Sequence, residues 1–264
     1  MNLAAGLLAA SVLADSGVEH YRGSFHNRAM FAPLAASALA LAVSAHGLTD
    51  HRRGSRAFRD AAYAAAGLTG LLGTGFHLYN IVKKPGGFPW LSLFYSAPVG
   101  APAALSLAGL MGFLAERVRD APPGEAPRIG GVAAGRVVAA LASAGIAGTV
   151  GEAGLLHFRG AYHNPFMFAP VSAPPVAAAL LAKAAVGTPR KPRPLTRWWL
   201  RLTAALGLAG VGFHAWGVSR GMGGWRNWSQ NVLNGPPLPA PPAFTALAIA
   251  GLAALGLMAE LSDG

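Results

Sequence analysis

The sequence predicts an all-α integral membrane protein with about eight transmembrane helices, built as a tandem duplication of a four-helix unit. Three observations lead to this prediction. Of the 264 residues, 53% are hydrophobic and only 12% are charged, whereas a soluble domain typically has about 25% charged residues. The apolar residues gather in long segments, and two phrases recur at a constant spacing. A soluble helical bundle fits less well, because its helices would have polar outer faces.

The apolar segments predict the helices in order. They cover residues 3–20, 29–49, 58–82, 91–116, 132–157, 166–187, 197–219 and 238–260. A bilayer core about 30 Å thick requires about 20 such residues per helix. Prolines at 98–102 and 236–242 blur the starts of the fourth and eighth segments. We expect the first segment to remain in the mature protein, because it lacks the basic start of a signal peptide and corresponds to the fifth segment.

The duplication is visible in two phrases. Residues 20–33 read HYRGSFHNRAMFAP and residues 157–170 read HFRGAYHNPFMFAP, identical at nine of fourteen positions and offset by 137. At the same offset, GLLGTGFH ends at His77 and GLAGVGFH ends at His214. The repeats predict a first unit at 1–120, a Pro/Gly-rich linker at 121–131 and a second unit at 132–264. An even number of helices per unit makes them parallel repeats.

The formal net charge is +11, and its distribution predicts topology. Fourteen of the 21 Lys and Arg residues fall on the side that holds the N-terminus, called here the basic side. The opposite side, called the histidine side, carries Arg22, Arg28, Lys83, Lys84, Arg159, Arg220 and Arg226. Basic loops stay in the cytoplasm, so we expect both termini there, and lipid rather than nucleic acid as the contact. The Ala-, Gly- and Arg-rich composition is typical of bacteria, which indicates the inner membrane and a periplasmic histidine side.

Several functional classes are excluded or disfavoured. The chain has no cysteine, which excludes disulfides, thiolate zinc sites, cysteine-ligated iron–sulfur clusters and covalent c-type haem. No Glu-x-x-His pair, His-Glu-x-x-His, Walker or dinucleotide motif occurs, so no particular enzymatic reaction is predicted. The loop at 188–196 holds three prolines and is not expected to be helical throughout.

Three histidines are kept in each unit, and the predicted topology brings all of them to the histidine side. The pairs are His20 with His157, His26 with His163, and His77 with His214. Imidazole is the commonest metal ligand, and three imidazoles with an open position suit zinc, copper or iron. Two histidines from two helices also suit the axial positions of a b-type haem. The sequence leaves the choice between a transition metal and haem open.

Other repeated residues are candidates for supporting roles. Asp15 and Glu152 precede the first histidine of their unit by five residues. This spacing places them too far around the helix to share a metal with that histidine. They are expected to support a histidine from another helix or to pair with Arg22 and Arg159. Those arginines could instead bind a haem propionate, a quinone oxygen or an anionic lipid. The other candidate supporting residues are Asn27 and Asn164 as N-caps, and Met30 and Met167 as axial ligands or packing residues.

The glycines before His77 and His214 predict that another group approaches the backbone of these helices closely. Gly70 and Gly73 share one helix face with His77, as Gly207 and Gly210 do with His214. Such a bare stripe admits either a flat group such as haem or a neighbouring helix.

Three functions remain open from the sequence. The first is a membrane protein with two equivalent sites for metal or haem, which passes electrons between a periplasmic redox protein and membrane quinone. The second is a non-catalytic subunit that anchors or docks a periplasmic oxidoreductase. The third is a transporter that uses Asp15 and Glu152, although the repeated polar residues gather at one surface rather than at the midplane.

Overall fold

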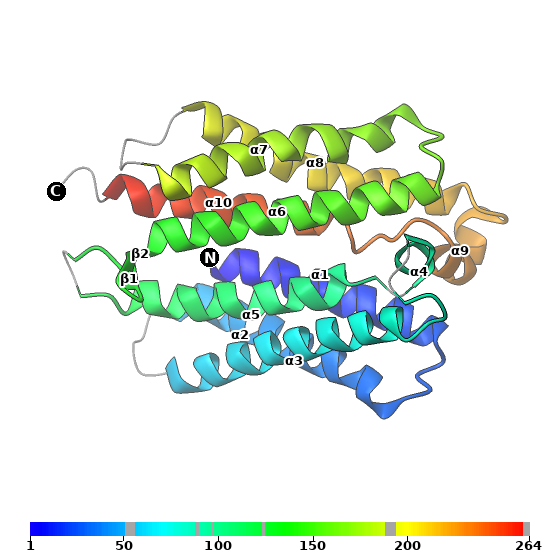
Figure 1. Ribbon diagram of the computed structural model, residues 1–264, viewed down its shortest axis with the longest axis horizontal. Coiled ribbons are helices and arrows are strands. Elements are labelled where there is room, and N and C mark those ends of the chain that lie inside the picture. Colours follow the sequence, from blue (N-terminus) through cyan, green and yellow to red (C-terminus); the bar gives the residue numbers. More distant parts are fainter. Residues whose placement is uncertain (51–55, 88–89, 97, 123–124, 188–193, 261–264) are drawn as a thin grey trace.

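The chain folds into a bundle of long, roughly parallel helices (Figure 1). The computed structural model describes residues 1–50, 56–87, 90–96, 98–122, 125–187 and 194–260. Its long helices are α1 (Asn2–Arg22), α2 (Ala32–Thr49), α3 (Arg56–Val82), α5 (Gly100–Arg119), α6 (Ala134–Arg159), α7 (Ala169–Val186), α8 (Pro194–Ser219) and α10 (Pro242–Glu260). Short helices are α4 (Trp90–Tyr95) and α9 (Trp228–Asn234), with 3₁₀ turns η1 (Arg28–Phe31), η3 (Pro165–Phe168) and η4 (Gly224–Asn227).

Six of these helices are long and apolar enough to cross a membrane, which indicates a multi-pass membrane protein. Within the described residues they are Arg28–Thr49, Gly100–Arg119, Ala134–Arg159, Pro165–Val186, Pro194–Ser219 and Pro242–Ala259. Helices α1 and α3 have the required length but are not among the six. Their charges lower their hydropathy: α1 contains Asp15, Glu19 and Arg22, and α3 contains Arg59 and Asp60. The expectation of eight spans is thus supported for six helices.

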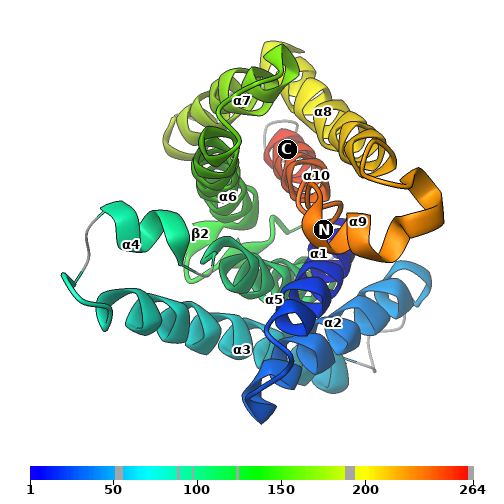
Figure 2. The same ribbon diagram turned by 90° about the vertical axis from the view of Figure 1, so that its right-hand side faces the viewer.

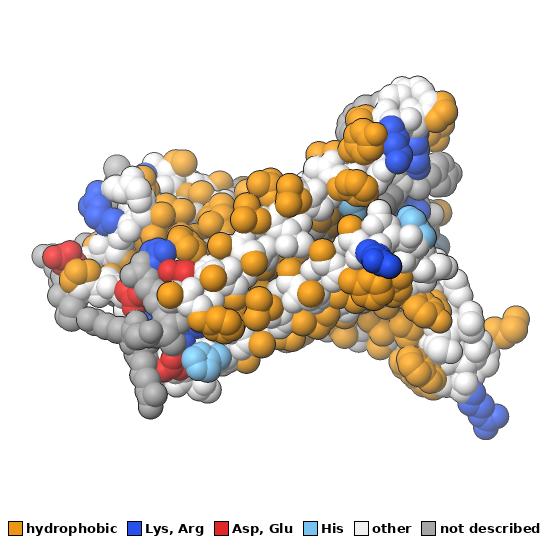
Figure 3. Space-filling view, turned by 90° about the horizontal axis from the view of Figure 1, so that it is seen from below, with side chains coloured by type: hydrophobic (Ala, Val, Ile, Leu, Met, Phe, Trp, Pro, Cys, Tyr) orange, Lys and Arg blue, Asp and Glu red, His pale blue; other side chains and the backbone are white. Residues whose placement is uncertain are grey.

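Side-chain types are distributed as a bilayer requires. Hydrophobic side chains form a broad band around the middle of the molecule, and charged side chains gather toward its two ends (Figure 3). The band includes side chains that would be unfavourable in water. On α3, for example, Leu68, Leu71 and Leu72 are 60%, 64% and 73% exposed. An apolar solvent around the bundle removes the cost of exposing them.

Seen from the histidine side, α1, α5, α6 and α10 lie at the centre of the bundle (Figure 2). Helices α2 and α3 flank them on one side, and α7 and α8 on the other. The core between the central helices is rich in alanine, including Ala5, Ala108, Ala142 and Ala250, all fully buried. Small residues allow helix backbones to approach closely, and this close packing drives helix association where burial from water cannot.

Two predicted helices begin later than their apolar segments. The fourth segment is divided into α4 and α5, and α5 starts at Gly100. The last helix starts at Pro242, after a run of prolines, because proline is tolerated best in the first turn of a helix. The predicted linker contains β1 (Arg128–Ile129), which pairs with β2 (Val132–Ala133) around Gly130 and Gly131, both with positive φ, as a two-residue hairpin turn requires. Residues 188–193 of the predicted proline-rich loop lie outside the described residues.

The helix faces that carry the glycines before His77 and His214 pack closely against neighbouring segments of the chain. A Cβ atom on Gly70 would overlap the backbone of Pro102 and Ser106 in α5, and one on Gly73 would lie 3.1 Å from the Pro102 Cβ. In the other half, Gly207 and Gly210 meet Pro241 and Thr245 in the same way. Of the two uses expected for the stripes, the structure therefore shows close helix approach.

The packing predicts a clear difference between two glycines of α3. Gly70→Ala should destabilise the protein by about 1–3 kcal/mol, because the added methyl group forces α3 and α5 apart. A Cβ atom on Gly75, farther along the same helix, would have no neighbouring atom within 4 Å, so Gly75→Ala should leave stability unchanged or raise it slightly. Thermal unfolding of both variants in the same detergent measures this, and equal melting temperatures would contradict the packing.

Candidate functional site

The longer repeated phrase folds into the same corner in both halves. After α1 the chain turns through Ser24 and Phe25, with φ of 55° and 45°; after α6 it turns through Ala161 and Tyr162, with φ of 54° and 46°. None of these residues is glycine, and the left-handed conformation costs a residue with a side chain about 1–2 kcal/mol. Surrounding contacts must therefore hold the corner.

His20 and His157 supply those contacts. The His20 Nδ1 atom lies 2.6 Å from the Met30 carbonyl oxygen, and the His157 Nδ1 atom lies 2.8 Å from that of Met167. Each imidazole also meets the edge or face of the aromatic residue at the corner, Phe25 or Tyr162, at ring-centroid distances of 6.2 and 6.0 Å. The aromatic residue in turn stacks on Phe31 or Phe168. Histidine thus fastens the end of one helix to the start of the next.

His77 and His214 make the equivalent bond one connection later. Their Nδ1 atoms lie 2.6 Å from the carbonyl oxygens of Pro98 and Pro237, in the segments that lead into α5 and α10. These carbonyls lie outside the helices, so they need a donor from elsewhere in a low-dielectric setting. The imidazoles provide it in both halves.

These four bonds determine the tautomer of each imidazole. A carbonyl oxygen only accepts, so the Nδ1 atom must carry the proton and donate it, and the Nε2 atom of a neutral ring keeps a free lone pair. All four rings are half-buried, and within the described residues their Nε2 atoms make no hydrogen bond. His20 and His77 lie within electrostatic range of each other, as do His157 and His214. We refer to the two half-buried histidines of each half as a histidine pair.

The third histidine of each half is placed differently. His26 and His163 are exposed, and each bonds through Nδ1, at 2.9 Å, to the carbonyl of Gly23 or Gly160 in its own turn. In the part of the chain that the structure describes, no three histidine or carboxylate side chains come together as a metal-binding group. The predicted set of three is thus divided into a half-buried pair and an exposed member.

The remaining residues of the phrase shape the corner. Asn27 and Asn164 are N-caps, as predicted, and accept bonds of 2.9 and 3.0 Å from the amides of Ala29 and Phe166. Met30 and Met167 contribute their backbone carbonyls to the histidines, while their side chains pack over the glycines that end α1 and α6. A Cβ atom on Gly23 would lie only 3.0 Å from the Met30 Cε, and one on Gly160 only 3.1 Å from the Met167 Cε.

Asp15 and Glu152 come within electrostatic range of each other where the two halves meet. Glu152 accepts a hydrogen bond from the backbone amide of Gly100, at the start of α5, and a Cβ atom on Gly100 would overlap its carboxylate. Counted from Pro98 and Pro237, the equivalent of Gly100 is Pro239, which has no amide hydrogen to offer Asp15. None of the interactions described for either carboxylate involves a histidine, the role expected for them.

The arginines of the phrase, Arg22 and Arg159, are both exposed. Arg22 forms an ion pair with Glu19 and lies within electrostatic range of Asp15, one of the partners expected for it. The second half has Leu156 at the position of Glu19.

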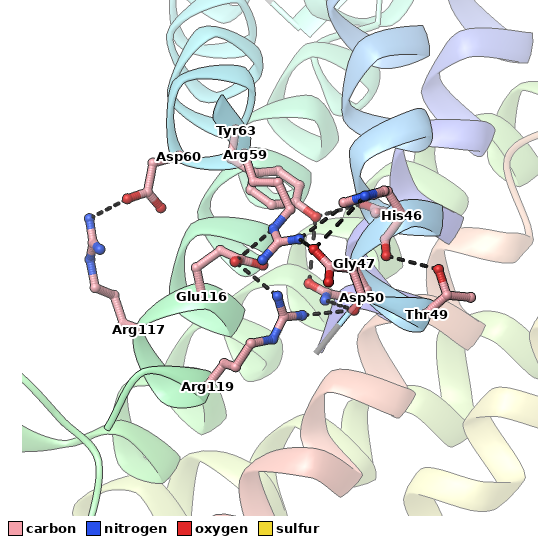
Figure 4. Close-up of polar contacts among 12 residues, drawn as sticks. His46, Gly47, Thr49, Asp50, Arg59, Asp60, Tyr63, Glu116, Arg117 and Arg119 are labelled. Carbon is pink, nitrogen blue, oxygen red and sulfur yellow. Dashed lines mark hydrogen bonds and ion pairs between the residues drawn. The ribbon is translucent and has the colours of Figure 1, made fainter. Parts of the chain in front are cut away.

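Sequence reasoning missed a buried ionic network at the basic side of the first half (Figure 4). Its centre is Arg59, 1% exposed, whose Nε donates to the fully buried Glu116 carboxylate at 2.8 Å and whose Nη1 donates to Asp50 at 3.0 Å. His46 accepts from the same Nη1 at 3.2 Å, and Arg119 donates to Glu116 at 3.0 Å. Two arginines are thus balanced by two carboxylates.

Neutral polar groups extend this network toward the N-terminus. The Asn2 side chain and Arg119 both donate to the Gly47 carbonyl, at 2.9 and 2.7 Å. The buried Tyr63 hydroxyl lies 3.1 Å from the Ser44 hydroxyl. Burial also lowers the pKa of the Met1 amino group. The network therefore joins α1, α2, α3 and α5 where the bundle meets the basic side.

The second half has mainly apolar residues at the equivalent positions. Thr196 and Leu200 stand where α3 has Arg59 and Tyr63, at the same offset as the histidines. Pro102 and Pro241 make equivalent close contacts, so α5 aligns with α10 at an offset two residues larger than the 137 of the histidines. At that offset the fully buried Leu255 stands in place of Glu116. The network is not required for building a four-helix unit. Arg59 and Glu116 inside apolar segments were the signal that could have identified it.

Comparisons with known proteins do not identify the chain. A scan against protein-family models and searches of curated proteins and of solved structures find no match.

The difference between the halves predicts how the network responds to substitution. Glu116→Leu should destabilise the protein by about 3–5 kcal/mol, because it leaves Arg59 and Arg119 without their buried carboxylate. The double variant Arg59→Thr/Glu116→Leu, which copies the second half, should lose much less, since Asp50 and Arg119 then balance in charge. Unfolding free energies of both single variants and the double variant form a thermodynamic cycle. Additive losses would show that the two side chains are not coupled.

Proposed function

We propose that this chain is a polytopic inner-membrane protein whose two histidine pairs, near the outer face, bind b-type haem or a transition metal for electron transfer with a periplasmic partner. The observation that carries the proposal is the repeated geometry of His20, His77, His157 and His214. Each has its Nδ1 proton committed to a backbone carbonyl and an Nε2 lone pair left free. Metal-binding histidines characteristically have their second nitrogen held in this way.

The pairing favours haem among the candidate groups. A b-type haem can be held by two axial imidazoles from two helices, which His20 with His77, and His157 with His214, would supply. A mononuclear zinc or copper site usually takes three or four protein ligands, and iron, copper or zinc would need a donor in addition to each pair. Bound haem supplies one-electron redox chemistry, while the chain holds each imidazole in one tautomer and in apolar surroundings.

The same proposal includes the membrane arrangement. Helices α1 and α3 complete eight spans as a tandem duplication of a four-helix unit, with both termini in the cytoplasm. Two facts support this. The fully buried residues Ala5 and Leu8 of α1 lie in the same core as the apolar spans, and α3 exposes leucines along its middle. The histidine and glycine contacts described above also recur between the two halves.

A specific observation also favours a second candidate, a non-catalytic subunit that docks a periplasmic oxidoreductase. The histidine bonds and aromatic stacks hold strained corners at Phe25 and Tyr162, a structural task that requires no cofactor. The exposed Trp225 lies in η4 and the exposed Trp228 begins α9, at the histidine end of the bundle, and Met222, just before them, is 89% exposed. They offer a surface for a partner or for the membrane interface.

Absorption spectroscopy with elemental analysis separates the two candidates. Protein purified in mild detergent should show a Soret band and sharp α and β bands after dithionite reduction, and His77→Ala should remove about half of the absorbance by destroying one of two sites. His26→Ala is the matched control and should retain the full spectrum, because His26 is exposed and bonded within its own turn.

Other outcomes are equally informative. Stoichiometric iron, copper or zinc without a Soret band, lost in His77→Ala, would place a non-haem metal at the pairs. A colourless, metal-free protein, taken from membranes under conditions that do not strip cofactors, would overturn the proposal in favour of the docking subunit.

The absence of native cysteine makes the topology directly testable. Met222→Cys, on the histidine side, should react in intact cells with a membrane-impermeant maleimide. Glu125→Cys, in the exposed connection on the basic side, should react only after the cells are lysed. The opposite pattern would reverse the orientation, and labelling of both residues in intact cells would contradict the three spans, α6, α7 and α8, that separate them.

A further inference from the structure

The second half contains a groove on its outer surface. It has a volume of about 360 Å³ and lies between α6 and α7, lined by Ser143, Ala147 and Val150 and by the facing residues of α7 from Pro175 to Ala182. Ala147 and Ala179 are exposed, so the groove opens to the outside of the bundle. Because α6 and α7 are both candidate membrane spans, it opens toward the lipid.

The lining is suited to a hydrocarbon chain. Its one hydroxyl group, that of Ser143, donates to the Ala178 carbonyl at 2.8 Å. The other lining residues are alanines, a valine and a proline. No polar group of the lining is left to bind a lipid head group. An apolar groove that faces a bilayer is filled most favourably by the acyl chain of a lipid.

At the equivalent positions of the first half, leucines stand in place of Ala178 and Val150, whereas glycine and alanine stand in place of Ser143 and Pro175. Gly6 and Leu41 correspond to Ser143 and Ala178 at the offset of 137. The Leu41 Cδ1 atom lies only 3.9 Å from the position of a Cβ on Gly6, so leucine occupies the space that Ala178 leaves open. Leu13 likewise stands in place of Val150.

Two cations lie beyond the end of the groove nearest the basic side. Arg136 is seven residues before Ser143 and Lys183 is four residues after Ala179, so both share the helix faces that line the groove. The Nε–H group of Arg136 donates a hydrogen bond to the Ala185 carbonyl oxygen at 2.7 Å. This bond uses one of the five N–H donors of the guanidinium group. Lys183 is exposed.

Basic residues outnumber acidic ones in the second half. From residue 132 to residue 264 there are ten Lys and Arg residues and three acidic residues, Glu152, Glu260 and Asp263. Glu152 lies at the opposite end of α6, and Glu260 ends α10. In the first half the position of Lys183 is held by His46, which accepts from Arg59 within the ionic network. The positive charge in this part of the second half is thus not matched by a network of the kind that surrounds His46.

We propose that the groove and the two cations form a binding site for one anionic phospholipid. One acyl chain lies in the groove between α6 and α7, and the phosphate lies between Arg136 and Lys183. An anionic head group near a membrane surface is attracted to each Lys or Arg beside it, and the filled groove adds apolar contact. The site depends on membrane insertion and not on the chemistry of the histidine pairs, so it stands or falls independently of haem or metal binding.

Native mass spectrometry of the delipidated, detergent-purified protein tests the site with dioleoyl phosphatidylglycerol and dioleoyl phosphatidylcholine as probes. We expect one phosphatidylglycerol to be retained about tenfold more strongly than phosphatidylcholine. Ala178→Leu, which copies Leu41 of the first half, should remove this tight binding by filling the groove. Lys183→Gln should abolish the preference for phosphatidylglycerol while leaving the weaker binding of phosphatidylcholine unchanged.

Controls distinguish this site from general attraction to anionic lipid. Lys83→Gln removes a cation on the histidine side and should not change the retention of phosphatidylglycerol. Equal retention of the two lipids by the unmodified protein would overturn the proposal. So would undiminished phosphatidylglycerol binding in Lys183→Gln, a substitution of an exposed residue that leaves the fold intact even if Ala178→Leu fails to fold.

Discussion

The structure depends on one constraint: a backbone carbonyl that leaves a helix in or near a bilayer must find a donor within the protein. Four such carbonyls, at Met30, Pro98, Met167 and Pro237, accept from imidazole Nδ1 atoms. Those bonds hold the corners between helices, determine the histidine tautomers and leave the Nε2 lone pairs free. The same four interactions therefore serve the fold and create the candidate ligands, which is why one sequence pattern fits both proposed functions.

The two halves use one scaffold for different purposes at the basic side. The first half places Arg59 and Glu116 in a balanced, buried network with Asp50 and Arg119. A buried ion pair is seldom more stable than apolar packing of the same volume, and the second half achieves packing with Leu200 and Leu255. Retaining the network instead of leucines implies a task other than stability.

The second half differs from the first in a second region, between α6 and α7, where Ala178 stands in place of Leu41. Ala178 lines a groove there, and Arg136 and Lys183 follow the same helix faces toward the basic side. Charge is thus neutralised inside the protein in the first half, whereas the second half has an exposed Lys183 on a candidate membrane span. A lipid held at the second half would make the two otherwise similar units unequal in their surroundings.

The sequence by itself determined the helical membrane class, most helix positions, the repeated phrases and the N-caps at Asn27 and Asn164, because periodicity, length and capping are local properties. Only the tertiary structure decided which histidines form pairs, that Gly70 and Gly207 admit a helix, and that Glu152 reaches Gly100 across the two halves. It also brought together Arg59 and Glu116, 57 residues apart. These outcomes depend on how helices rotate and pack against one another, which is settled by side-chain volumes and buried hydrogen bonds between distant segments.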